Sequence, residues 1–224
     1  MPFTPKAWLL RLWQVLWDDF RNFYTRRNLG RLALGFLVGA ILANTPLDQW
    51  LADAYQANLH SNSRAATAFQ NGTKGLGDRD VVILAPIVAM TVGILAPAHP
   101  ATAAIGLWGS QFTRTFLAAA PMAYGASWLL GGDRPKNKCG SHWHPWRGKQ
   151  YGISGHAMAG SISFLVLAGM STNPIVQTLC YAGSGLTAWS RVDSQSHYPS
   201  QVLLGWWLSF LAMRLIRKRR RVRL

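Results

Sequence analysis

The chain has 224 residues, of which 50% are hydrophobic and only 14% are charged, against about 25% charged residues in an average soluble domain. Its 23 Lys and Arg outnumber eight acidic residues, all of them Asp, and give a formal net charge of +15. The lack of Glu argues against a Glu-based metal cage and against a Glu pair for glycoside hydrolysis. Cys139 and Cys180 lie far apart and give no disulfide framework.

The basic residues are concentrated at the two ends of the chain. Six of the 23 lie within residues 1–31 and seven within residues 214–224, and long apolar stretches lie between these groups. A nucleic-acid-binding face would need cations spread along folded elements. The distribution therefore favours a membrane protein that binds no nucleic acid and whose basic ends contact anionic lipids.

Residues 1–28 predict an amphipathic helix in the headgroup region. The segment contains Asp18 and Asp19 and shows no small-residue cleavage site, which argues against a signal peptide. Apolar side chains recur at steps of three and four residues, and the Trp among them favour the membrane interface over a soluble packing helix. These side chains are Leu9, Trp13, Leu16, Trp17, Phe20 and Tyr24.

Six apolar segments follow, each a candidate for a membrane crossing. Arg31 must snorkel from the first segment, Pro121 is expected to interrupt the third, and prolines and other helix stops separate several of them. The segments cover about 29–47, 81–97, 101–130, 154–170, 174–189 and 199–216.

The predicted fold class is all-α, a six-transmembrane-helix bundle with an N-terminal amphipathic interfacial helix. Residues 1–224 form a single integral-membrane domain in this interpretation. It comprises the interfacial helix at 1–28, the bundle at 29–216 and a basic cytoplasmic tail at 217–224. The sequence carries no signal for an oligomeric state.

An even number of crossings places both termini on one side of the membrane. The positive-inside rule assigns that side to the cytoplasm, because basic clusters flank the first and last segments. We therefore expect a multi-pass protein of a bacterial inner membrane, with loops 48–80, 131–153 and 190–198 facing outward. Loop 48–80 is expected to contain a short amphipathic helix, either as a gate or as a passive connection.

Arg114 lies near the middle of the third apolar segment. An arginine within a membrane segment is a candidate functional residue and must face the bundle interior or a wet cavity. The sequence does not identify its partner.

Three polar motifs occur at the predicted outward ends of the helices. Ser154 is suited to cap the fourth apolar helix, whose free N–H groups would bind an anion, and Gly155 lets a phosphate oxygen approach the backbone. The forked guanidinium groups of Arg134 and Arg191 match phosphate oxygens two at a time. The motifs are Asp133-Arg134-Pro135, Gly152-Ile153-Ser154-Gly155-His156 and Ser190-Arg191 followed by His197.

His156 and His197 supply the proton-transfer chemistry of this constellation. One imidazole as nucleophile and the other as leaving-group acid would complete a phosphoryl-transfer site without a metal. Gln201 lies four residues after His197, on the same face of the predicted sixth helix. Its carbonyl could therefore fix the tautomer of the attacking ring.

These residues resemble the motifs of the type-2 phosphatidic acid phosphatase superfamily, Lys-x6-Arg-Pro, Pro-Ser-Gly-His and Ser-Arg-x5-His-x3-Asp. The resemblance covers about residues 127–201 and keeps the motifs in order. It implies that His197 attacks phosphorus and forms a phosphohistidine, while His156 protonates the leaving alkoxide and later activates water. It also implies that no metal or other cofactor is needed and that the phosphate is held by Arg134, Ser154, Gly155 and Arg191.

Three positions depart from the family pattern. The loss of the Asp matters most, because an amide cannot stabilise an imidazolium by charge, and the comparable change in serine proteases costs about 10⁴ in turnover. Candidate substitutes are Asp193 for the Asp and Lys136, Lys138 or Lys149 for the Lys. The departures are Ser127 for Lys, Ile153 for Pro and Gln201 for Asp.

The sequence therefore predicts an integral-membrane lipid phosphatase, with phosphatidic acid, phosphatidylglycerol phosphate, undecaprenyl pyrophosphate and lipid A as candidate substrates. Two alternatives stay open: a lipid phosphotransferase on the same scaffold, and a degenerate lipid-phosphate-binding protein. Cys139, His142 and His144 offer weak metal-ligand spacing without a fourth ligand. The neighbouring Trp143 and Trp146 indicate an interfacial loop instead.

Overall fold

The computed structural model of the chain describes residues 5–147 and 151–218, and within these ranges the fold is all-helical, as predicted. The elements are α1 (Pro5–Phe23), α2 (Arg26–Ala43), α3 (Pro46–Asn58), α4 (Arg64–Gly75), α5 (Arg79–Leu95), α6 (Pro100–Leu130), the short 3₁₀ helix η1 (Pro135–Asn137), α7 (Gly155–Met170), α8 (Pro174–Gly183), α9 (Leu186–Asp193) and α10 (Pro199–Lys218).

Most of the predicted apolar segments are single helices. The first, second, third, fourth and sixth segments correspond to α2, α5, α6, α7 and α10, whereas the fifth divides into α8 and α9. At the division the Ser184 hydroxyl donates to the Tyr181 carbonyl at 2.6 Å. Gly185 follows, and glycine has a low helix propensity. A local hydrogen bond and a flexible residue thus end α8 inside a continuous apolar stretch.

The predicted interruption at Pro121 is wrong, because α6 continues through this residue. Proline lacks the N–H that would bond to the carbonyl four residues earlier, and it crowds the preceding turn. A neighbouring carbonyl in that turn, that of Ala118, accepts the Tyr24 hydroxyl at 3.2 Å. A donor from outside the helix thus contacts the turn that precedes the proline.

Membrane crossing is not decided by helix length and composition. No single helix in the described ranges is both long and apolar enough to span a bilayer. α2 and α3 satisfy the requirement only as a pair, and a bend of 72° separates them. The all-helical class of the predicted fold is confirmed, and the six crossings stay a prediction.

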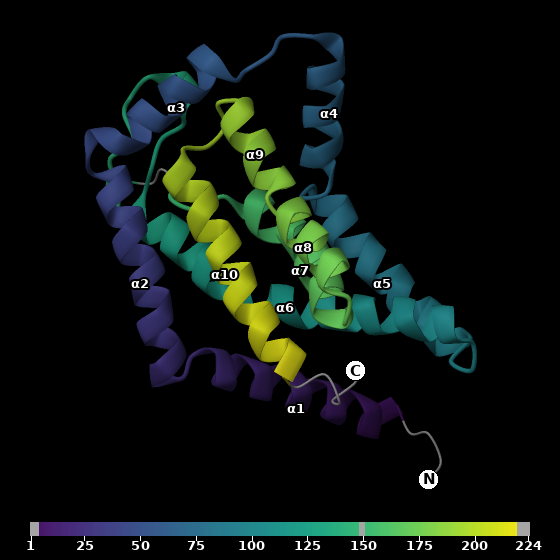
Figure 1. Cartoon of the computed structure of the whole chain (residues 1–224). Helices are drawn as coiled ribbons and strands as arrows, with labels where there is room; N and C mark the ends of the chain where they lie inside the picture. The colour runs from purple at the N-terminus through teal and green to yellow at the C-terminus, as the bar shows by residue number, and fades with distance from the viewer. Residues whose placement is uncertain (1–4, 148–150, 219–224) are drawn as a thin grey trace.

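The helices place the two ends of the chain opposite the polar loops. In Figure 1, α1 lies across the lower end of the bundle near both termini, and α3 and the beginning of α10 lie at the upper end. α10 packs against α2, α6 and α7. The loop before α7 joins the upper end as well, because the Ser141 hydroxyl donates to the Ala43 carbonyl at 2.9 Å.

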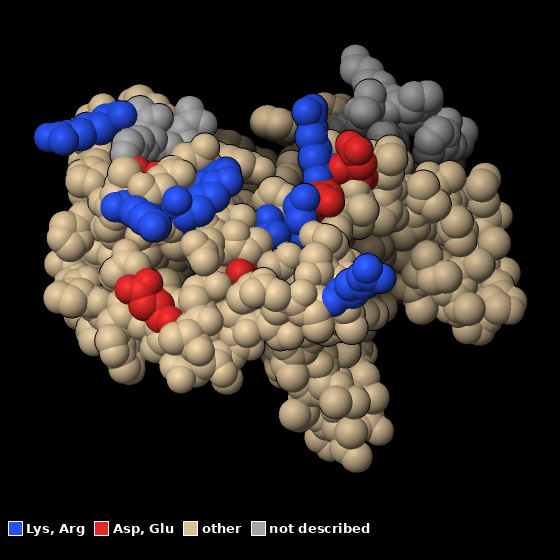
Figure 2. All heavy atoms as spheres, turned by 90° about the horizontal axis from the view of Figure 1, so that it is seen from above, with Lys and Arg blue, Asp and Glu red and all other residues tan. Residues whose placement is uncertain are grey.

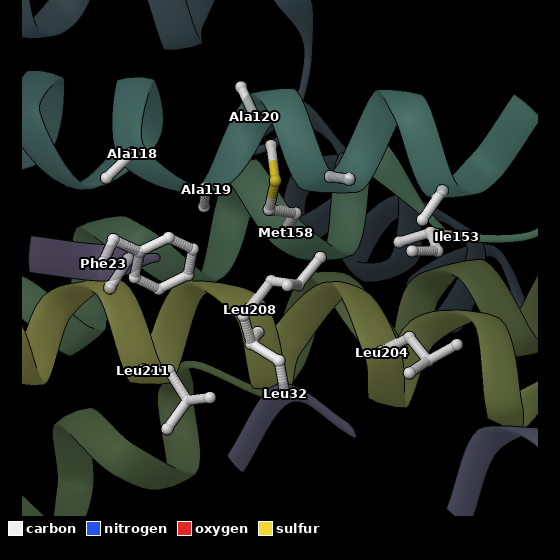
Figure 3. Close-up of a cluster of buried hydrophobic side chains, with 13 residues drawn as sticks. Phe23, Leu32, Ala118, Ala119, Ala120, Ile153, Met158, Leu204, Leu208 and Leu211 are labelled. Atoms are coloured by element: carbon white, nitrogen blue, oxygen red, sulfur yellow. The ribbon is translucent and has the colours of Figure 1, made fainter. Parts of the chain in front are cut away.

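Small residues bring α6, α7 and α10 close together. Figure 3 shows the alanines of α6 facing Met158 of α7 and Leu204 and Leu208 of α10, all of them buried. A Cβ atom at Gly205 would lie 2.5 Å from the carbonyl oxygen of Ser154. This close approach holds the beginning of α7 against the first two turns of α10, the part of the bundle that carries Ser154, His156 and Gln201.

The N-terminal helix forms as predicted, and one of its faces packs on the bundle. Val15, Asp19 and Phe23 are buried, while Trp13 and Trp17 are exposed on the aromatic face predicted for the membrane interface. The position of that face in the headgroup region stays a prediction.

The buried partner of Arg114 is Asp19. The Arg114 Nε lies 2.6 Å from one carboxylate oxygen of Asp19, and Nη2 lies 2.9 Å from the other. Both residues are 1% exposed. The arginine that the sequence marked as a functional candidate thus joins α6 to α1 in a forked ion pair.

Candidate active site

The three predicted motifs meet where α7 and α10 begin. The backbone N–H of Ser154 donates to the carbonyl of Gln201 at 3.0 Å, and the side-chain N–H of Gln201 donates to the carbonyl of Asp133 at 2.9 Å. Figure 2 views this end and shows Lys and Arg side chains beside Asp side chains, with uncharged surface around them. The arrangement brings residues far apart in the sequence into one polar site.

The tautomer of His197 is set by Gln201. Nδ1 of His197 lies 2.8 Å from Oε1 of Gln201, and the amide nitrogen of Gln201 points at the Asp133 carbonyl, which can only accept. Oε1 must therefore face the ring, and Nδ1 must carry the hydrogen. The Tyr198 N–H also donates to Oε1, at 3.2 Å. The lone pair of His197 consequently lies on Nε2, the nitrogen that remains for attack.

His197 is neutral at physiological pH. Its residue is only 7% exposed, and this burial lowers its pKa to about 4. The hydrogen bond to Gln201 acts in the opposite direction, and the charges of Arg134, Arg191 and His156 lower the pKa further. A neutral imidazole with a fixed tautomer has the properties of a nucleophile.

Asp193 does not replace the missing family carboxylate, so that expectation is wrong. Its carboxylate accepts hydrogen bonds from the side chains of three residues before α5: Tyr55 at 2.8 Å, His60 at 2.9 Å and Gln70 at 2.6 Å. Asp193 therefore ties α3, α4 and the segment between them to α9. The segment 48–80 is accordingly packed against α9 at this end of the molecule.

Two guanidinium groups supply unpaired donors. The Nε atoms of Arg134 and Arg191 are buried and have no hydrogen-bond partner within residues 5–147 and 151–218. The guanidinium carbon of Arg134 lies 4.0 Å from the ring centre of Tyr151, whose ring centre is 6.3 Å from that of His197. Buried donors are normally paired, so two orphaned ones beside an imidazole indicate an anion site. Tyr151 is a member of the site that the motifs did not reveal.

The beginning of α7 presents backbone donors, as predicted. The Ser154 hydroxyl accepts the N–H of Ala157 at 3.2 Å, and Ser154 is fully buried as the N-cap. The N–H groups of Gly155 and His156 belong to the first turn, which has no partners inside a helix. A Cβ at Gly155 would meet only the Tyr124 ring, at 3.9 Å or more. Packing alone therefore does not require glycine here, whereas close approach of an anion would.

Ser127 serves a structural role in place of the family Lys. Its hydroxyl accepts the N–H of Ile153 at 3.3 Å and donates to the carbonyl of the same residue at 3.4 Å. This contact joins α6 to the segment before α7, and Ile153 itself belongs to the hydrophobic core. Lys136 and Lys138 are exposed, and Lys149 lies outside the described residues.

The second histidine has a carboxylate partner that the motif analysis missed. Nε2 of His156 lies 3.1 Å from Oδ1 of Asp78, the residue before α5. Lys74, in the last turn of α4, is close enough for its charge to act on His156. The signal in the sequence was a carboxylate directly before an apolar helix, a position that ordinarily indicates a cap.

Cys139 and His142 contact backbone carbonyls of their own loop and of α2. No group of three potential metal-ligating His, Cys, Asp or Glu side chains occurs among the residues that the structure describes. The Cys139 thiol donates to the Asn137 carbonyl at 3.3 Å, and Nδ1 of His142 lies 3.2 Å from the Ala43 carbonyl. Both contacts hold the loop in place.

Comparison with known proteins identifies one family. The sequence model of the PAP2 superfamily matches residues 102–223, which include all three motifs, α6 from its third residue onward and the helices from α7 to α10. No curated protein and no solved structure matches the chain.

Proposed function

The chain belongs to the PAP2 superfamily, whose activity is generally that of a phosphatase, and we propose that it hydrolyses a membrane lipid phosphate through a phosphohistidine on His197. The observation that carries the proposal is the placement of a neutral, oriented His197 beside two guanidinium groups whose Nε atoms have no hydrogen-bond partner among the described residues. Such a site offers a nucleophile together with donors for a phosphate and its developing charge.

In the proposed reaction, Nε2 of His197 attacks phosphorus while the ester or anhydride bond breaks. His156 gives a proton to the departing oxygen, and a water molecule later loses its proton to His156 as it attacks the phosphohistidine. Arg134, Arg191 and the first N–H groups of α7 hold the phosphoryl oxygens throughout. Inorganic phosphate and the dephosphorylated lipid are the products, and both histidines return to their starting forms.

A membrane location is proposed on the exposed apolar surface. Large apolar side chains are solvent-exposed along α2, α5 and α8, for example Leu37, Leu84 and Leu179 at 58%, 60% and 66% exposed. Patches of this kind mark contacts with lipid or protein. Arg214, Arg217 and Lys218 lie at the opposite end from the site, which suits a cytoplasmic end and a site facing outward.

The proposal is tested with the purified protein in detergent, presented separately with phosphatidic acid, phosphatidylglycerol phosphate, undecaprenyl pyrophosphate and lipid A. We expect release of inorganic phosphate from at least one of them in the presence of a chelator. Absence of release from the whole panel, or activity that disappears with the chelator, would contradict it. Transfer of the phosphate to an added acceptor lipid would identify a phosphotransferase instead.

Gln201 favours a second candidate function, a lipid-phosphate-binding protein with little turnover. The amide orients His197 without supplying the charge that a carboxylate would contribute when the ring becomes a phosphorylated cation. Saturable binding of a lipid phosphate without phosphate release would support this candidate against the phosphatase.

The pH dependence of phosphate release tests the protonation state of His197. Because its pKa is about 4 rather than 6.5, the ring is neutral above about pH 4 and protonated below it. We expect the acid limb of kcat/KM to lie near pH 4. In Gln201→Asp a carboxylate would stabilise the imidazolium and move that limb to higher pH. Ionisation of the substrate is common to both proteins, so the difference between them is diagnostic; coincident limbs would refute the assignment.

A further inference from the structure

We propose that Asp78, at the junction of α4 and α5, is a positioning residue that orients the His156 imidazole and stabilises its charged form during protonation of the leaving group. This inference rests on the proposed function. It gives the segment between α4 and α5 a part in the reaction, although this segment lies outside all three motifs and before residues 102–223, the range that the family matches.

The contact between the two side chains determines which nitrogen can donate. Oδ1 of Asp78 lies 3.1 Å from Nε2 of His156, so the carboxylate accepts the Nε2–H. In the imidazolium, the second hydrogen is then on Nδ1 and is left for the oxygen of the leaving group. The side chains are 43% and 39% exposed, which leaves the pair accessible to a substrate.

Asp78 does not make the contact expected of its position. It is the N-cap residue of α5, yet its side chain makes no capping hydrogen bond to that helix. An N-cap Asp ordinarily accepts a backbone N–H of the first turn. Here the carboxylate oxygen meets His156 instead, so its placement follows the histidine rather than the helix end.

The junction between α4 and α5 lies against the first turn of α7. A Cβ at Gly77 would lie 2.5 Å from the carbonyl oxygen of His156, so only glycine allows this approach of the two backbones. α4 is itself anchored, because the Thr187 hydroxyl of α9 donates to the Thr73 carbonyl at 2.9 Å. The position of Asp78 beside His156 is therefore fixed by contacts within the junction and in α4.

The charges around His156 explain why a carboxylate is useful there. Lys74 of α4 and Arg191 of α9 carry the positive charges that act on His156, and each disfavours a positive charge on its ring. Asp78 opposes them. His197, the proposed nucleophile, is thus paired with a neutral amide, and His156, the proposed acid, with a carboxylate. The different partners favour a neutral ring in the first and a charged ring in the second.

The test compares two phosphate monoesters with leaving groups of different basicity, para-nitrophenyl phosphate and a short-chain phosphatidic acid. A nitrophenolate leaves without a proton, whereas an alkoxide needs a general acid, which contributes roughly 10²–10⁴ in rate. We expect Asp78→Asn to lower kcat/KM for the phosphatidic acid by about tenfold or more and for the aryl ester by less than about twofold. The alkaline limb of the phosphatidic acid profile should also move to lower pH.

Three further variants define the result. Asp80 is an exposed carboxylate in the first turn of α5, and Asp80→Asn should leave kcat/KM unchanged for both substrates. Asp78→Glu should restore part of the lost rate, and Asp78→Asn added to His156→Ala should cause no further loss with the phosphatidic acid. Equal losses with both esters, or an unchanged alkyl rate, would overturn the inference while leaving the phosphatase intact. If the unsubstituted protein hydrolyses neither ester nor any lipid phosphate, the proposed function itself fails.

Discussion

Replacing His197 by alanine is expected to reduce phosphate release by about 10⁴-fold or more, the scale seen when a covalent nucleophile is removed from other hydrolases. The reason is positional. Nε2 of His197 carries the free lone pair, because Nδ1 donates its hydrogen to Gln201. His156 is already engaged with Asp78. His156 is therefore held by a different partner for a different step and does not take the place of His197 as the attacking group. Two quantities are measured for the unsubstituted protein and the variant. The first is phosphate release from the best lipid substrate, and the second is acid-labile phosphate bound covalently to the protein.

A matched histidine separates this effect from a general loss of structure. His144 lies in the loop at the same end of the molecule and is partly exposed, so His144→Ala should retain activity. Because His197 is buried, the variant must also be compared by thermal unfolding, and His197→Gln offers a larger polar replacement. A folded His197→Ala protein that still hydrolyses the lipid at an unchanged rate would rule out the phosphohistidine.

The elements of the fold were predictable because they depend on local patterns. Apolar runs bounded by proline and polar turns predicted helices, and α7 and α10 begin within one residue of the predicted positions 154 and 199. The prediction was wrong where tertiary contacts decide. The turn before Pro121 is contacted by the hydroxyl of Tyr24, which is almost 100 positions away in the chain. No local sequence pattern reveals such a contact.

The candidate site was predictable in its motifs and less so in its partners. Spacing placed Gln201 on the same face as His197, and the structure gives that contact at 2.8 Å. The sequence did not reveal Asp78 and Tyr151, because their contacts are made between distant segments. The prediction for Asp193 was wrong, because nearness in sequence to His197 does not imply contact. Its carboxylate instead binds residues 55, 60 and 70.

The ion pair between Arg114 and Asp19 belongs to the same class of long-range contact, and it carries the largest expected effect on stability. Asp19→Asn would remove the carboxylate charge that binds a guanidinium at 1% exposure. Breaking one partner of a buried pair costs about 3–5 kcal/mol of the free energy of unfolding. We expect a loss of this size for Asp19→Asn, measured as denaturant unfolding of the detergent-purified protein by Trp fluorescence.

The double variant distinguishes the cost of an unpaired charge from the worth of the pair. Replacing both groups by apolar residues, as in Asp19→Leu with Arg114→Met, removes the need to bury any charge, and such replacements are often neutral or stabilising. The double variant should therefore recover most of the stability lost in Asp19→Asn, whereas Asp80→Asn at an exposed position of α5 should have little effect. Additive losses in the double variant would mean that the ion pair itself, rather than satisfaction of a buried charge, holds α1 against α6.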